Sequence, residues 1–232
     1  MVMIKSGIIS FIFLLGILVF SVYTYAQQGQ KVTVSEIIGE RREYYFDDNI
    51  VGELPFGFQS TLTGKGKAGH WIVKKTEKSP SADNVVAQVK HDSTDYRFPL
   101  LIAEGVSYKD CMVYAWFRAE DGKIDQAGGL VFRYKDNNNY YVLRANVLEN
   151  NVRVYKVVNG KRTQIGGKDT KVNPKEWHLL KVICKGDKIQ CFFNNTKVIE
   201  VSDNTFDSGG VGLWTKSDSY TYFDDLIMQE LK

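Results

Sequence analysis

Short runs of alternating apolar and polar residues recur along the chain, and they constrain its fold more than any other feature of the sequence. Turns rich in glycine, asparagine and aspartate separate the runs, for example at 135–139 and 149–151. Connections this short favour antiparallel pairing, because parallel neighbours need long crossovers. The sequence therefore predicts an all-β protein, a two-sheet antiparallel β-sandwich of the jelly-roll type, in which only residues 34–42 suit a short helix. The expected strands cover residues 70–74, 84–90, 95–102, 111–118, 128–134, 140–148, 152–158, 177–184, 189–193, 196–201, 211–216 and 220–228.

The first 26 residues have the composition of a secretory signal peptide. Lys5 precedes an uncharged apolar run over residues 7–20, and small residues stand where a signal peptidase cleaves, after Ala26. We expect a signal peptide at 1–26, a lead-in segment at 27–45 and the sandwich domain at 46–232. The protein would then be secreted or periplasmic, without stable membrane insertion after cleavage. An uncleaved N-terminal membrane anchor is the alternative.

The charge balance and the rarity of histidine and cysteine exclude several classes of site. The chain has 30 Lys and Arg against 27 Asp and Glu, a formal charge of +3, which does not form the basic surface of a nucleic-acid binder. Three histidines and three cysteines argue against zinc clusters. Cys184 and Cys191 flank a tight turn that places Cys184 opposite Ile189 and Cys191 one diagonal step away. We therefore expect free buried thiols there rather than a disulfide, with Cys111 as a small core residue.

Alternation along the strands also sorts polar and aromatic side chains onto one face. If the strands 111–118, 128–134, 140–148, 152–158 and 211–216 share a sheet, their outward positions carry arginines and large aromatic residues. Proteins bind sugars with aromatic rings together with polar side chains that form bidentate hydrogen bonds. An ordinary exposed sheet, with tryptophans packed under a loop, is the alternative. The predicted carbohydrate-binding residues are Trp116, Arg133, Arg144, Asn146, Arg153, Tyr155, Trp214 and Lys216.

Several segments of the chain also resemble a known family. They are 126–136, 139–146, 176–182, 210–216, the opening Phe46-Asp47-Asp48 and the closing residues 222–225. Together they are similar to the concanavalin A-like jelly rolls of the 3-keto-disaccharide hydrolase domain family, often labelled family 16 glycoside hydrolase-like. The resemblance runs from about Phe46 to the C-terminus and implies a concanavalin A-like fold and a glycan partner. It does not decide the activity, because this superfamily includes lectins, carbohydrate-binding modules and hydrolases.

The carboxylate pattern of the retaining family 16 glucanases is absent. Those enzymes use Glu-x-Asp-x-x-Glu, which puts a nucleophile and an acid/base on one strand face, and no glutamate here is followed two positions later by aspartate. Other carboxylates, Glu120, Asp121, Asp125 and Glu149, stand at expected sheet edges, where turn formation and solubility account for them. Whether the chain is an enzyme stays open, and the sequence assigns no catalytic residue.

Three functional hypotheses follow from these observations. The first is a secreted carbohydrate-binding domain that acts on glycans. The second, implied by the resemblance, is a hydrolase or lyase for 3-keto-disaccharides or related sugars. A ketone acidifies the neighbouring C–H, so a base such as His70 or a rim carboxylate would suffice, with an arginine or a metal to steady the enolate. The third is a structural envelope or adhesion domain.

Two pairs of aspartates form a candidate metal site. Asp47 and Asp48 lie at the start of the expected domain, and Asp224 and Asp225 lie near its end. First and last strands of such sandwiches commonly pair, which would bring the four carboxylates together. They would repel one another unless a cation neutralises them, and Ca²⁺ is the cation that carboxylate oxygens favour. The alternative is that one aspartate of each pair caps a turn and the other is solvated.

Overall fold

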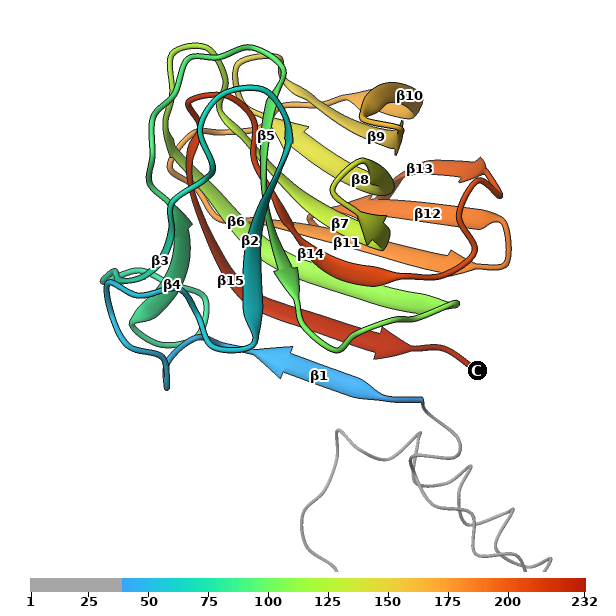
Figure 1. Cartoon of the computed structure of the whole chain (residues 1–232), viewed down its shortest axis with the longest axis horizontal. Coiled ribbons are helices and arrows are strands. Elements are labelled where there is room, and N and C mark those ends of the chain that lie inside the picture. The colour runs from blue at the N-terminus through green and yellow to red at the C-terminus, as the bar shows by residue number, and fades with distance from the viewer. Residues whose placement is uncertain (1–38) are drawn as a thin grey trace, which may run out of the picture. The chain divides into compact units, whose positions relative to one another are not determined.

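The computed structural model describes residues 39–232, which fold into two antiparallel sheets packed face to face (Figure 1). The predicted signal peptide and the part of the lead-in before residue 39 lie outside the described residues. Within the described part, no helix is long and apolar enough to cross a membrane. The predicted all-β sandwich is confirmed.

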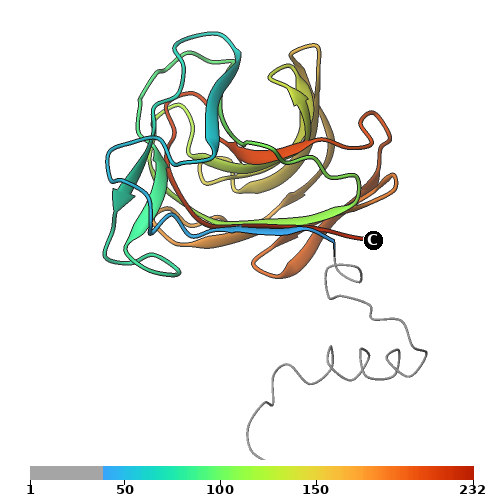
Figure 2. The same ribbon diagram turned by 60° about the horizontal axis from the view of Figure 1, so that its bottom comes forward.

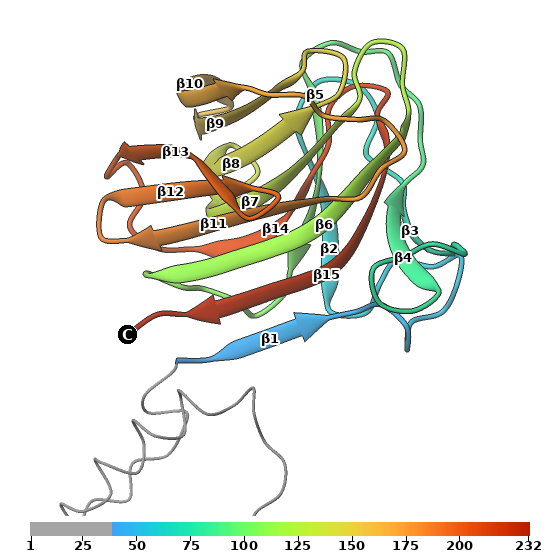
Figure 3. The ribbon, with the colours of Figure 1, turned by 180° about the vertical axis from the view of Figure 1, so that it is seen from behind.

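One sheet has eight strands in the order β13-β12-β11-β6-β15-β4-β3, with β1 paired to β15 (Figure 3). First and last strands therefore pair as expected. The strands are β1 (Arg41–Tyr44), β3 (Trp71–Lys75), β4 (Asn84–Gln88), β6 (Cys111–Asp121), β11 (His178–Lys185), β12 (Lys188–Phe193), β13 (Thr196–Ser202) and β15 (Tyr220–Glu230).

The other sheet has seven strands in the order β10-β9-β8-β7-β14-β5-β2. They are β2 (Phe58–Gly64), β5 (Arg97–Ala103), β7 (Ala127–Asp136), β8 (Asn139–Asn146), β9 (Asn151–Val158), β10 (Lys161–Asp169) and β14 (Gly210–Trp214). All twelve predicted strands are present in the two sheets. Three strands were not anticipated, namely β1, β2 and β10, and Arg41 and Arg42 lie in β1 rather than in a helix.

Alternation builds the core between the sheets. On β6 every odd-numbered residue from Cys111 to Ala119 is buried and the even-numbered ones are half-buried on the outside. The inner faces pack with aromatic pairs such as Phe132 and Tyr141, whose rings are stacked 5.3 Å apart. Removal of this apolar surface from water is the main favourable contribution to folding.

The cysteine prediction is confirmed. Cys184 lies opposite Ile189, and Cys191 lies opposite Val182, the next inward position along β11. All three cysteines are buried and free. Burial raises the pKa of the Cys191 thiol, which keeps it protonated and unreactive.

The backbone of the seven-stranded sheet is strongly bent, and we call its concave outer side, which side chains fill, the trough (Figure 2). In Figure 2 teal β2 rises on one side of orange β14, and ochre β9 and β10 rise on the other. Two contacts join the sides: Tyr96 Oη donates to the Gly160 carbonyl at 2.9 Å, and Thr63 Oγ1 lies 2.8 Å from Tyr140 Oη. The floor of the trough is therefore buried although it faces outward. It consists of Phe98, Leu100, Ile102, Ala127, Val131, Tyr140, Val142, Val157 and Trp214.

Candidate functional site

The trough brings together most of the predicted sugar-binding face. Five of the eight predicted residues lie in or beside it. They are Arg144, Asn146, Tyr155, Trp214 and Lys216. They meet because β8, β9 and β14 belong to the seven-stranded sheet and the cross-strand register puts them on one face. Arg144 is opposite Arg153, and Asn146 is opposite Asn151.

Trp116 does not belong to this face. Its outward orientation on β6 is as expected, but β6 lies in the eight-stranded sheet, between β11 and β15. The expectation failed because β6 and β7, although consecutive, belong to different sheets. Trp116 is half-buried on the far side of the sandwich, opposite Leu179 and Asp224.

Arg133 is also outside the trough, because the backbone turns it inward. It has a φ of 50°, and the β7 register shifts between Phe132 and Asp136. This bulge breaks the alternation and re-aims the side chain. The buried guanidinium donates to the carbonyls of Lys109, Phe206 and Gly186 at 2.7–3.2 Å. Arg133 thus holds loops together at the end of the sandwich.

Arg144 is the centre of a buried polar network. Its side chain is 1% exposed, and Nη2 donates to Glu149 Oε2 at 3.0 Å, Asn151 Oδ1 at 2.7 Å and Tyr155 Oη at 3.2 Å. Burial opposes ionisation of Glu149, but the hydrogen bond and charge of Arg144 outweigh it and lower the pKa of that carboxyl to about 2. Among the described residues, Arg144 Nε has no hydrogen-bond partner although it is buried.

Asp125 extends this network toward β14. Its buried carboxylate contacts Lys216 Nζ at 2.7 Å and accepts a hydrogen bond from Asn146 Nδ2 at 2.5 Å. Burial raises the pKa of Asp125, and Lys216 opposes that rise. Asn146 Nδ2 also reaches Glu149 Oε1 at 3.3 Å, so the two carboxylates share one amide. We call the connected set the polar cluster; it consists of Asp125, Arg144, Asn146, Glu149, Asn151, Tyr155 and Lys216.

Aromatic rings adjoin the polar cluster in the trough. The Trp214 and Phe98 rings are stacked, 5.3 Å apart. Trp214 lies opposite Gly129, where a Cβ would meet the indole at 3.3 Å, so the absence of a side chain at Gly129 makes room for the ring. The Arg162 guanidinium lies over the rings of Phe98 at 4.6 Å and Tyr155 at 4.4 Å. Phe98 and Trp214 are fully buried beneath Arg162, whereas Tyr155 is half-buried beside the polar cluster.

Arg153 lies on the same face but is directed away from the polar cluster. Its Nη2 donates to Asp169 Oδ1, and its stem crosses Gly167, where a Cβ would come within 2.4 Å. The ion pair with Asp169 holds the guanidinium at the edge strand β10. Arg153 is therefore a neighbour of the polar cluster rather than a member of it.

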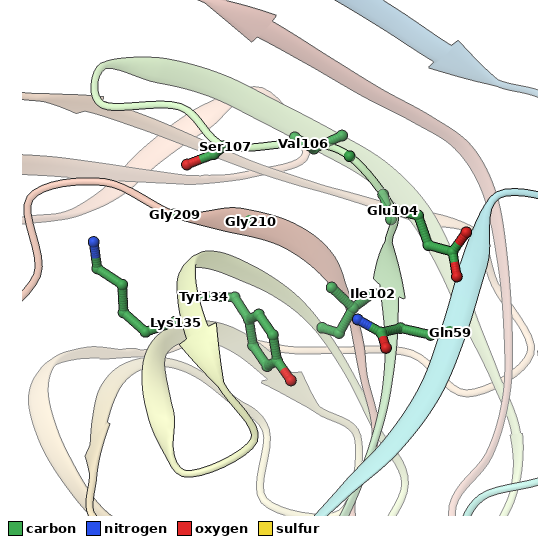
Figure 4. Close-up of a pocket in the computed structure, with 11 residues that line it drawn as sticks. Gln59, Ile102, Glu104, Val106, Ser107, Tyr134, Lys135, Gly209 and Gly210 are labelled. Atoms are coloured by element: carbon green, nitrogen blue, oxygen red, sulfur yellow. The ribbon is translucent and has the colours of Figure 1, made fainter.

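A hollow opens at another place along the bent sheet (Figure 4). It has a volume of about 560 Å³ and lies beside β2, β5, β7 and β14. In Figure 4 the Tyr134 hydroxyl, the Gln59 amide and the Glu104 carboxylate lie around it, with Lys135 on the far side. None of the predicted sugar-binding residues lines this hollow.

Electrostatic interactions connect three of the four aspartates of the predicted metal site, Asp224 with Asp225 and Asp225 with Asp47. Asp47 Oδ1 accepts from the backbone amide of Asn84 at 3.2 Å, and Asp224 Oδ2 accepts from Ser81 Oγ at 3.1 Å. Asp48 is exposed. Across residues 39–232, no three His, Cys, Asp or Glu side chains are grouped to hold a metal ion. The calcium site stays a prediction.

The sequence did not indicate the roles of four trough residues. Asp125 and Glu149 were assigned to turns, and Asn151 and Arg162 were not singled out. Arg162 was missed because β10 itself was missed: its Thr163-Gln164 and Gly166-Gly167 steps are not strand-like, and a bulge falls between Gln164 and Gly166. His70, the candidate base, is exposed in the segment before β3 and is not part of the trough.

Solved structures with this arrangement of strands include carbohydrate-binding proteins. The carbohydrate-binding module CBM66 from Bacillus subtilis has a TM-score of 0.58 at 21% identity, covering 73% of this chain and 93% of that chain. Domain 4 of the extracellular arabinanase AbnA from Geobacillus stearothermophilus, solved with arabinotriose, has a TM-score of 0.54 at 13% identity, covering 81% and 90%. The exoplasmic domain of VIP36, solved with Ca²⁺ and a mannose glycan, has a TM-score of 0.52 at 12% identity, covering 76% and 84%. At these identities the likeness concerns the fold.

Comparison at the sequence level identifies the family. A search of curated proteins gave no match. The profile of the 3-keto-alpha-glucoside-1,2-lyase-like domain matches residues 57–227, from the start of the second strand almost to the end of the last. This range contains every member of the polar cluster and both sheets of the sandwich except β1. The chain belongs to the family of 3-keto-alpha-glucoside-1,2-lyase-like domains.

Proposed function

We propose that the trough binds a sugar at the polar cluster, and that the protein is an exported glycan-binding domain. The observation that carries this proposal is the juxtaposition of arginine, lysine, amide and carboxylate groups with the half-buried ring of Tyr155. Pyranose rings present hydroxyls at their edge and C–H groups on their faces, and this surface complements both. Glu149 is exposed, and Tyr155 and Lys216 are half-buried, so solvent reaches the cluster.

Binding to a glycan panel tests the proposal, with one variant in the polar cluster and one in the hollow beside Gln59. Glu149→Gln keeps the size of the side chain and removes the charge that holds Arg144. We expect this variant to lose at least tenfold in affinity, because a charged hydrogen-bonded network is disrupted. Gln59→Ala, in the hollow beside β2 and β5, is the control and should bind as the wild type does. Equal losses in both variants, or loss only in Gln59→Ala, would place the sugar outside the polar cluster.

A lyase activity on 3-keto-glucosides is the second candidate, and Asp125 is the observation that favours it. A buried carboxylate whose pKa is raised is a stronger base than an exposed one, and it lies beside the cation Lys216. The base would take the proton from C2, the C–H electrons would form the C1–C2 double bond, and the C1–oxygen bond would break. The departing oxygen would take a proton from the Lys216 ammonium or water, while Arg144 stabilises the negative charge on the C3 oxygen.

Turnover separates the two candidates. The protein is incubated with a 3-keto-glucoside and with the same glucoside before oxidation, and the released aglycone is measured by mass spectrometry. Release from the keto sugar alone, lost in Asp125→Asn, supports the lyase. Binding without release supports the glycan-binding domain. Neither binding nor release would leave the structural envelope or adhesion role.

A further inference from the structure

One of the three cations in and beside the polar cluster has no ion pair. Arg144 is paired with Glu149 at 3.0 Å, and Lys216 is paired with Asp125 at 2.7 Å and lies 3.8 Å from Asp95. Arg162 has no carboxylate within ion-pair distance among residues 39–232. The guanidinium of Arg162 is therefore the charge in this part of the described chain that lacks a direct counter-ion.

The surroundings of Arg162 make this unpaired charge unfavourable in the empty trough. Its guanidinium lies 4.4–5.8 Å from the ring centres of Tyr155, Phe98 and Trp214. Nη1 is buried and has no hydrogen-bond partner in the described part of the chain. Burial lowers the pKa of the guanidinium, and the charge of Arg144 lowers it further. The rings fix the orientation of the Arg162 guanidinium, but they do not accept hydrogen bonds from its N–H donors.

A second arginine has a free donor in the same place. Arg144 is 1% exposed, and its Nε lacks a partner although Nη2 has three. Buried polar groups are nearly always hydrogen-bonded, so an unpaired donor in a buried arginine points to a missing acceptor. Tyr155 connects the two sites, because its ring lies under both guanidinium groups, at 5.6 Å from Arg144 and 4.4 Å from Arg162.

We propose that the sugar bound at the polar cluster carries a carboxylate, as a uronic acid does, and that Arg162 binds this carboxylate. The inference rests on the proposed sugar-binding function and specifies the class of sugar. A carboxylate offers two oxygens in a plane, which matches the fork of a guanidinium and supplies the missing negative charge. The sugar ring lies beside Tyr155, and its hydroxyls reach Glu149 and Lys216, the members of the cluster that solvent reaches.

Paired ligands test the charge requirement without changing the protein. Uronic acid oligosaccharides are compared with their methyl esters, which keep the ring, the linkages and the hydroxyls but lack the charge. Isothermal titration of the full mature chain should show at least tenfold tighter binding of the acid, since hydrogen bonds to charged groups are the stronger ones. A matching series of sulfated neutral sugars distinguishes a carboxylate from a sulfate ester.

Variants then locate the charge. Arg162→Gln keeps a polar side chain of similar length and should reduce the acid-over-ester preference to nearly one, whereas Arg162→Lys should retain part of it. Arg153→Gln is the matched control, because it removes a charge from the same face that is already paired with Asp169. Melting temperatures of all three variants show whether the fold is intact.

The outcomes separate this inference from the function on which it rests. Tighter binding of the acid, lost in Arg162→Gln and kept in Arg153→Gln, supports it. Equal binding of acid and ester, with binding lost in Glu149→Gln, overturns the carboxylate but leaves the sugar site in place. A preference for sulfated over carboxylated sugars overturns the uronic acid assignment. No binding of any sugar overturns both the inference and the proposed function.

Discussion

Asp224 provides the sharpest test of how this sandwich balances buried charge. Its side chain is fully buried on β15, where Oδ2 accepts from Ser81 Oγ at 3.1 Å and Oδ1 accepts from the Asp225 amide at 2.8 Å. Burial raises the pKa of Asp224 to about 7, and the neighbouring charge of Asp225 adds to this effect. No ion pair of Asp224 occurs in the described part of the chain. We therefore expect the change Asp224→Asn to alter the pH dependence of stability.

The sign and size of the effect follow from the two pKa values. In the unfolded chain the carboxyl titrates near 3.8, and in the folded chain near 7. Between these values the folded state holds a proton that the unfolded state has lost. The free energy of unfolding therefore falls as pH rises from about 4 to about 7 and is independent of this group outside that window. Because one pH unit corresponds to about 1.4 kcal/mol, the loss is up to about 4 kcal/mol.

Urea unfolding at pH 4.5, 5.5, 6.5, 7.5 and 8.5 measures this loss, with chelator present throughout. Asp224→Asn cannot ionise at this position, so the difference between its free energy of unfolding and that of the wild type should grow by up to about 4 kcal/mol across the window, while the other carboxyls affect both proteins alike. Above pH 7 the variant should then be the more stable protein by about 2–4 kcal/mol. Asp48→Asn, in an exposed position of the same acidic group, is the control and should follow the wild type. Parallel curves for wild type and Asp224→Asn would refute the reasoning.

Three further predictions concern metal binding, thiols and a buried arginine. Excess chelator and millimolar Ca²⁺ should give the same melting temperature, because Asp47 and Asp224 already accept hydrogen bonds; a rise with Ca²⁺ would show a bound cation. The three buried thiols should not react with Ellman's reagent at pH 8 in the native protein and should all react in urea, and fast native reaction would contradict their burial. Arg97→Met should lower the free energy of unfolding by about 3 kcal/mol, because buried Arg97 donates to the carbonyls of Lys67, Ala68 and Ser217, whereas Arg153→Met should cost about 0.5 kcal/mol. Equal losses in these two variants would refute that role of Arg97.

The fold was predictable because alternation and turn composition are local properties. The twelve expected strands are short runs bounded by turn residues, several with a period-two pattern such as that of β6, and each is present. The missed strands lack that pattern for physical reasons. β1 is only four residues long, and β10 is an edge strand whose burial pattern shows no alternation and whose Gly166-Gly167 step follows a bulge. Edge strands are held by pairing on one side only, so their sequences are less constrained.

The sequence did not predict which strands join which sheet. Errors in the predicted site arise partly from this. Trp116 has the expected outward orientation, but a strand's sequence does not state which of two sheets it joins. Arg133 has the expected sheet but the wrong face, because a left-handed residue within β7 reverses the side chain. Only glycine adopts that conformation easily, so an arginine there gives no warning in the sequence.

The pairing of charges is the property of the site that was hardest to predict from the sequence, and it is also the most informative about the ligand. The chain as a whole is nearly balanced, with 30 cationic and 27 anionic residues. That balance does not reveal which charges are paired: Asp169 neutralises Arg153 at the edge, while Arg162, on the neighbouring strand, has no ion pair in the described part of the chain. The difference arises from where the side chains point across β9 and β10. A protein that keeps a desolvated guanidinium unpaired among three aromatic rings bears an energetic cost that a negatively charged ligand would remove.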